Sequence, residues 1–132
     1  MQLTMENTGG ANRIRAYDVG SVTVNEHALV RTTVVMRDDL ITDWEPEDIR
    51  GLTEHHLERL LQLDPELIVI GTGRWQRFPD RRVLSRLIRA GIGVEVMTTP
   101  AACRTYNVLV AENRRAIAAL FMIEPDPRDD PT

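Results

Sequence analysis

Apolar runs mark three strands in the second half of the chain, over residues 66–70, 92–97 and 115–123. The run over 66–70 is continuous, which is typical of a strand in a sheet covered on both faces. Between the first two runs, positions 80–90 carry apolar residues at helical spacing, and Gly91 follows as a stop signal. A right-handed crossover then predicts that the first two strands are parallel neighbours.

Two further helices are predicted from their start signals. Thr98 supplies a capping hydroxyl and Pro100 a first-turn proline for a helix that runs to about Glu112. Thr53 precedes E-H-H-L-E-R-L-L, which places three leucines on one face of a helix that ends at Asp64-Pro65.

The first half of the chain is rich in β-branched residues and predicts strands. Segments 14–18 and 21–25 have the character of short strands, and 28–36 that of a longer one. Asn25-Glu26 lies at a hairpin turn between the last two. The charged segment 37–48 is expected to be a connector. A single globular domain over 14–123 follows, with disorder expected at 1–13 and in the proline-broken acidic tail at 124–132.

Composition narrows the function classes. Apolar content of 42%, charged content of 27% and a net charge of −4 are ordinary for a soluble domain and argue against a nucleic-acid partner. All 16 basic residues are arginine, so no lysine is available for Schiff-base chemistry. No apolar run is long enough to cross a bilayer, and the N-terminus has no apolar core like that of a signal peptide. We therefore expect a cytoplasmic protein without membrane insertion.

The glycine turn that follows the 66–70 strand is the main candidate for chemistry. It lacks the lysine of a phosphate loop, and Gln76 stands at the third glycine position of a dinucleotide fingerprint. Two interpretations remain. Gly71 and Gly73 form only a tight strand exit, or Arg74, Arg77 and nearby helix N-termini bind a small anion.

This turn and the one before the third helix should meet at one edge of the sheet, where ligands bind in open α/β folds. The candidate binding cleft between them comprises Gly71, Gly73, Arg74, Arg77, Thr98, Thr99, Cys103, Arg104, Tyr106 and Asn107.

Cys103 is the one thiol, and it lies in the first turn of its helix, where the helix dipole favours a thiolate. No histidine is near it in sequence to act as a base, since His27, His55 and His56 are the only ones. A small buried hydrophobic role is therefore expected. No cysteine or histidine pair has zinc spacing, so we expect no metal and no cofactor.

Three motifs in fixed order give a family resemblance. G-T-G-R-W-Q-R-F-P at 71–79, G-I-G-V-E-V-M at 91–97 and A-C-R-T-Y-N-V-L at 102–109 resemble the family called domain of unknown function 498, over roughly 15–121. The resemblance implies three layers around a central mixed, mostly parallel sheet, with flanking helices and an N-terminal β-hairpin packed on it. The family usually has Asp where this chain has Thr98, so an acid role there is not carried over.

The resemblance also implies a function class. The family has no established enzymatic activity and includes a mitochondrial assembly factor for a respiratory complex. Because the chain has no segment like a mitochondrial transit peptide, it resembles a bacterial member. We expect a non-catalytic module that binds protein partners, with a role like that of an assembly factor. The alternative is a small-molecule or anion-binding protein, or an enzyme, that uses the cleft between the 71–79 and 98–104 turns.

Overall fold

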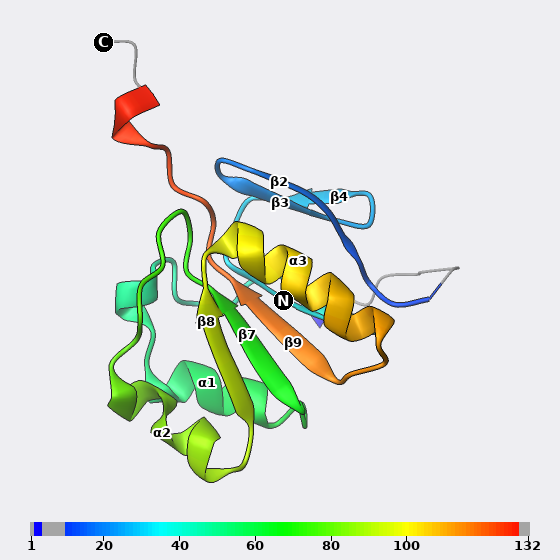
Figure 1. Cartoon of the computed structure of the whole chain (residues 1–132), viewed down its shortest axis with the longest axis vertical. Helices are drawn as coiled ribbons and strands as arrows, with labels where there is room; N and C mark the ends of the chain where they lie inside the picture. The colour runs from blue at the N-terminus through cyan, green and yellow to red at the C-terminus, as the bar shows by residue number, and fades with distance from the viewer. Residues whose placement is uncertain (1, 4–9, 130–132) are drawn as a thin grey trace.

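A six-stranded mixed sheet forms the middle layer of the molecule (Figure 1). The computed structural model describes residues 2–3 and 10–129, and its strand order is β1-β6-β5-β9-β7-β8. The strands are β1 Gln2–Leu3, β5 Thr33–Met36, β6 Asp39–Ile41, β7 Leu67–Gly71, β8 Gly93–Met97 and β9 Ala116–Leu120.

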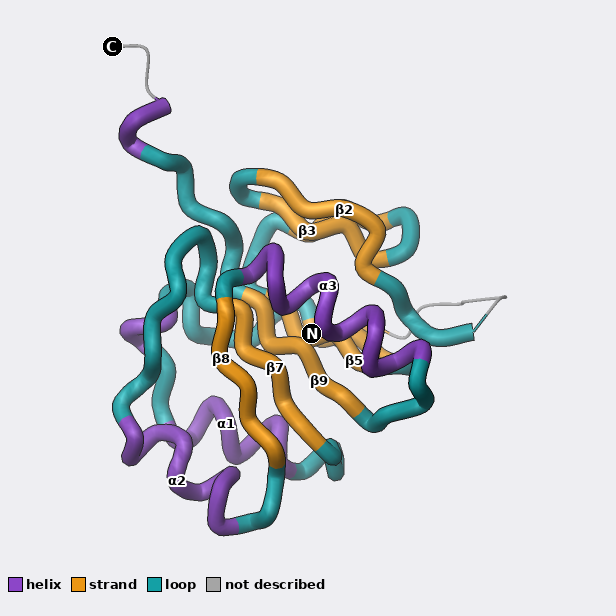
Figure 2. The backbone as a smooth tube through the Cα atoms, in the orientation of Figure 1, coloured by secondary structure: helices purple, strands orange, loops and turns teal. Residues whose placement is uncertain are grey.

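Helices cover both faces of this sheet. One face packs on α1 and α2, and the other on α3, over which a three-stranded antiparallel sheet lies (Figure 2). The bounds of these elements are α1 Glu54–Leu61, α2 Arg81–Arg89, α3 Thr99–Ala111, β2 Ile14–Asp18, β3 Ser21–Val24 and β4 His27–Leu29. The chain also has two short 3-10 helices, η1 Ile49–Gly51 and η2 Pro127–Asp129.

The alternation of side chains along β7 explains its continuous apolar run. Ile68 and Ile70 join the core beneath α1 and α2, whereas Val69 joins the core beneath α3. A strand between two cores has no solvated face, so every position selects an apolar residue. All five residues of β9 are buried for the same reason.

The main topological predictions are confirmed. β7 and β8 are parallel, with Leu67 opposite Gly93 and Gly71 opposite Met97, and α2 lies between them in the chain. Thr98 is the N-cap of α3. The three layers and the mixed sheet are also confirmed. Within the central sheet, β7 pairs in parallel with β8 and β9, whereas the pairs made by β5 and β6 are antiparallel.

The first half of the chain differs from expectation at two places. The predicted strand over 28–36 is two strands, since the chain leaves β4 in the small sheet and enters β5 in the central one. The predicted connector over 37–48 contains β6, which forms a hairpin with β5 in which Met36 is opposite Asp39. The two residues of its turn, Arg37 and Asp38, are both charged, so the residue pattern did not indicate a hairpin there.

The structure describes residues on both sides of the expected domain bounds of 14–123. Residues 1, 4–9 and 130–132 lie outside the described part of the chain, but β1 pairs with β6. The buried Asn12 side chain donates hydrogen bonds to the carbonyl oxygens of Met36 and Asp39, at 3.0 and 2.9 Å. In the acidic tail, Asp126 is buried and accepts hydrogen bonds from Arg128.

The last residue of β7 sets how closely α3 approaches the sheet. A Cβ atom added to Gly71 would lie 2.9 Å from the Cα and from the Oγ1 of Thr99, and 3.0 Å from the Cβ of Ala102. Cβ contacts of this length are too short to be accommodated without movement of the helix. Glycine is therefore required at this position by close packing.

We expect Gly71→Ala to lower the free energy of unfolding by about 1–3 kcal/mol, because the added methyl group overpacks the contact with α3. Gly51→Ala is the matched control, since a methyl group added there would have nothing within 4 Å and the backbone is not left-handed. Urea unfolding of both variants measures the difference. Equal stability of the two variants would contradict the packing argument.

Candidate functional site

The two turns at the carboxyl edge of the sheet are neighbours, as predicted, and one threonine joins them. The Thr99 backbone N–H donates to the Gly73 carbonyl oxygen at 2.9 Å. The Gly73 N–H donates to Thr99 Oγ1 at 2.8 Å, and this hydroxyl donates to the Phe121 carbonyl oxygen at 2.6 Å. Thr99 is fully buried. These contacts fill the space between the turns at Gly71, Gly73 and Thr99.

Two further candidates of the predicted cleft are buried in the α3 core. Cys103 is buried, and desolvation raises the pKa of its thiol to about 12. Tyr106 is also buried, which raises its pKa, and its hydroxyl donates to the Asn12 carbonyl oxygen at 3.0 Å. Both side chains are neutral at physiological pH, so neither is prepared to act as a nucleophile.

The remaining candidates on α3 make structural contacts. Asn107 pairs with the backbone of Ile14, accepting from its N–H at 2.9 Å and donating to its carbonyl oxygen at 2.7 Å. Arg104 Nη1 donates to the Tyr17 hydroxyl at 2.7 Å. Both contacts tie β2 to α3. The Thr98 hydroxyl caps the helix by accepting from the Ala101 N–H at 3.4 Å.

Residues 73–79, which we call the aromatic loop, are held in place by polar contacts. Thr72 Oγ1 donates to the Trp75 carbonyl oxygen at 2.6 Å and accepts from the Arg77 N–H at 3.2 Å. Gln76 Nε2 donates to the Val96 carbonyl oxygen, at 2.9 Å, on the outer edge of β8. The backbone of the loop is therefore held by the hydrogen bonds of Thr72 and by the hydrogen bond from Gln76 to β8.

The two candidate arginines belong to this loop and lie among carboxylates. Arg74 Nε donates to the backbone carbonyl oxygen of Glu124 at 2.7 Å, and the backbone N–H of Arg74 donates to Glu124 Oε1 at 3.3 Å. The guanidinium carbons of Arg74 and Arg77 lie 6.0 and 5.6 Å from the ring centre of Trp75. Arg77 is also near Asp48, whose pKa is lowered to about 2, mainly by hydrogen bonds from Arg50.

The aromatic side chains of the loop remain at the surface. Trp75 is 40% exposed and Phe78 is 72% exposed. A hollow of about 310 Å³ adjoins Phe78 and is lined in part by Ile49, Leu52 and Val83. Both aromatic residues lie within the motif at 71–79 but are not among the site residues predicted from the sequence. The sequence feature that could have indicated them is a pair of large aromatic residues in a loop bounded by Gly73 and Pro79.

Metal and membrane features are limited in the described part of the chain. Across residues 2–3 and 10–129, no group of three or more His, Cys, Asp or Glu side chains is placed to hold a metal ion. His56 instead caps α1, where its Nδ1 accepts from the Thr53 N–H at 3.0 Å. None of the described helices is long and apolar enough to span a bilayer.

The fold and the carboxyl edge of its sheet define a class of protein. It is a three-layer α/β domain in which a glycine turn is hydrogen-bonded to the start of α3 and is followed by exposed aromatic side chains. The chain belongs to the family described as Protein of unknown function (DUF498/DUF598), whose model matches residues 14–121. The resemblance of its three motifs to that family is thereby confirmed.

Two curated proteins that are similar to this chain have names that differ from each other. The 13 kDa major membrane protein of Francisella tularensis is 41% identical over 68 residues, which are 52% of this chain and 55% of that protein. The mouse NADH dehydrogenase [ubiquinone] 1 alpha subcomplex assembly factor 3 is 34% identical over 66% of this chain and 48% of its own. The chain thus spans about half the length of these curated relatives.

A solved structure supports the same fold. The crystal structure of a Bordetella parapertussis protein matches with a TM-score of 0.81 and 32% sequence identity, over 88% of this chain and 99% of that one.

Cys103 gives a direct test of the packed core. Because its thiol is buried and its pKa is raised to about 12, we expect slow labelling by a thiol reagent at pH 7–8 in native protein and fast labelling in denaturant. The labelling rate of the native protein should remain low until the pH approaches about 12, unless the protein unfolds first. Fast labelling of native protein at neutral pH would contradict this account of the α3 core.

Proposed function

We propose that this protein is a non-catalytic protein-binding module with an assembly-factor-like role, and that the aromatic loop is its docking surface. The observation that carries the proposal is the exposure of Trp75 and Phe78 on a loop whose backbone is fixed by hydrogen bonds. Large aromatic side chains are enriched among residues that dominate binding energy at protein interfaces.

The rigidity of the loop favours this role. A partner that binds a mobile loop must offset the entropy lost when the loop becomes ordered. Here the contacts of Thr72, Gln76 and Arg74 hold the backbone before any partner arrives. The hollow beside Phe78 offers a complementary recess for an apolar side chain of the partner.

The charges around the loop suit a protein partner better than a small anion. Arg74 is tied to Glu124, and Arg77 lies near Asp48, so both signs of charge surround the aromatic residues. A mixed polar rim around an apolar centre is the usual composition of a protein interface. A small-molecule site between the two turns has less support, because Thr99 fills that space and Cys103 is neutral.

The names of the relatives support one class of partner. The mouse relative is named as an assembly factor for a subcomplex of NADH dehydrogenase. By analogy, we expect this chain to bind a subunit of a multi-subunit complex before that complex is complete. Shared fold alone does not establish shared function, so the test must address the loop itself.

We expect Phe78→Ala and Trp75→Ala each to reduce partner capture by about tenfold or more, since truncation of a central aromatic residue commonly costs about 2 kcal/mol of binding. The measurement is affinity capture from the native host with quantitative mass spectrometry. Support requires that the proteins lost from both variants are subunits of one complex.

Val108→Ala provides the control, because Val108 is an apolar residue of α3 that is 56% exposed and lies outside the loop. Its capture profile should match wild type, and the melting temperatures of all three variants should remain close to the wild-type value. Capture that is unchanged in Phe78→Ala and Trp75→Ala would refute the docking surface.

A further inference from the structure

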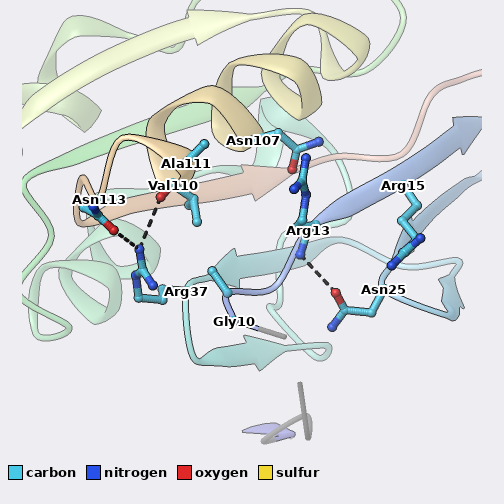
Figure 3. A pocket seen from close by; sticks show the side chains of 10 residues that line it. Gly10, Arg13, Arg15, Asn25, Arg37, Asn107, Val110, Ala111 and Asn113 are labelled. Carbon is cyan, nitrogen blue, oxygen red and sulfur yellow. Dashed lines mark hydrogen bonds between the residues drawn. The ribbon is translucent and has the colours of Figure 1, made fainter. Parts of the chain in front are cut away.

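A second hollow lies at the other end of α3 from the aromatic loop (Figure 3). Its volume is about 360 Å³, and it opens where the C-terminal end of α3 faces the start of β2 and the β5–β6 turn. Gly73 contacts the first residue of α3, whereas Asn113 follows the last turn of that helix. A helix of 13 residues is roughly 20 Å long, so the two surfaces are distinct.

The lining of this hollow, which we call the basic pocket, is positively charged. It contains the arginines Arg13, Arg15 and Arg37 and the asparagines Asn25, Asn107 and Asn113, and none of the described residues that line it is an aspartate or a glutamate. In a chain of net charge −4, this is a local excess of positive charge. Arg13 and Arg15 make no ion pair with a carboxylate of the described residues.

Arg37 is held in position at the rim of the pocket. Its Nη2 donates to the Val110 carbonyl oxygen at 3.2 Å and to Asn113 Oδ1 at 2.8 Å (Figure 3). Both bonds come from Nη2. The other two guanidinium nitrogens of Arg37, Nε and Nη1, have no hydrogen-bond partner among the described residues. The guanidinium is therefore oriented while part of its donor set remains available.

The wall opposite α3 is fixed through Asn12. The Asn12 N–H donates to the Arg37 carbonyl oxygen at 2.8 Å, and its Oδ1 accepts from Asn25 Nδ2 at 2.9 Å. Asn25 in turn accepts from the Arg13 N–H at 3.0 Å. Asn107 ties the neighbouring Ile14 to α3. The backbones that carry Arg13 and Arg37 are thus joined by polar contacts through the buried Asn12, and the pocket is preformed.

We propose that the basic pocket binds a compact organic anion that carries two or more phosphate or carboxylate groups. The planar guanidinium fork matches both oxyanions and pairs with them bidentately. Three arginines around one hollow can compensate more than a single negative charge, and a volume of about 360 Å³ is within the range of small-molecule sites. This inference does not depend on the docking role of the aromatic loop.

The test is calorimetric titration of the full chain with pyrophosphate and, separately, with citrate, in about 0.15 M sodium chloride to screen non-specific attraction. We expect wild-type protein to bind at least one probe with a Kd below about 1 mM. Arg13→Gln and Arg15→Gln should each weaken binding by about tenfold, since each removes one charge-assisted contact. The probe that binds more tightly assigns the preferred group.

Arg82→Gln is the matched control, because it removes the same charge from an exposed position on α2. Its affinity should remain within about twofold of wild type. Melting temperatures establish that each variant is folded. Two results would overturn the proposal: equal weakening by Arg82→Gln, or no binding of either probe, whether or not the protein is retained on phosphatidylglycerol vesicles. Phe78→Ala should bind the probes as wild type does, which separates this test from that of the docking surface.

Discussion

The buried hydroxyl of Thr99 is the contact on which the arrangement of this domain depends. It accepts a hydrogen bond from the glycine turn after β7 and donates one to the segment after β9, while its own backbone begins α3. Three segments distant in sequence meet at one atom. Gly71 makes this possible, because any side chain there would collide with the helix. With the turn fixed at its base, residues 73–79 project from the sheet in a defined conformation.

At the C-terminal end of α3, the side-chain amides of Asn107 and Asn12 hold neighbouring segments together. Of the β2 residues Ile14 alone is buried, so apolar contacts do not by themselves give this strand a fixed register on the helix. Asn107 supplies one by pairing with both backbone groups of Ile14, and Asn12 links that strand to the β5–β6 turn. Breaking such a network leaves buried polar groups unsatisfied, which costs about 1–3 kcal/mol per group. The small sheet is therefore a fixed part of the domain.

These two sets of contacts give α3 a surface at each of its ends. The aromatic loop at its start offers apolar side chains within a mixed-charge rim, and the basic pocket at its end offers arginines, with no carboxylate among the described residues that line it. Because one rigid helix separates them, the two surfaces can be studied independently. Separate variants can therefore address each surface.

The sequence by itself determined the β7-α2-β8-α3-β9 core. Apolar periodicity, the Thr98 cap and the stop at Gly91 are local signals, and a right-handed crossover converts them into parallel strands. Other features were decided by the tertiary structure alone. It divided 28–36 between two sheets, added β6 to the central sheet and exposed Phe78. It also brought Arg37 beside Asn113, 76 positions away in the chain. Such contacts are set by packing and by hydrogen bonds between distant segments, and no local pattern of residues encodes them.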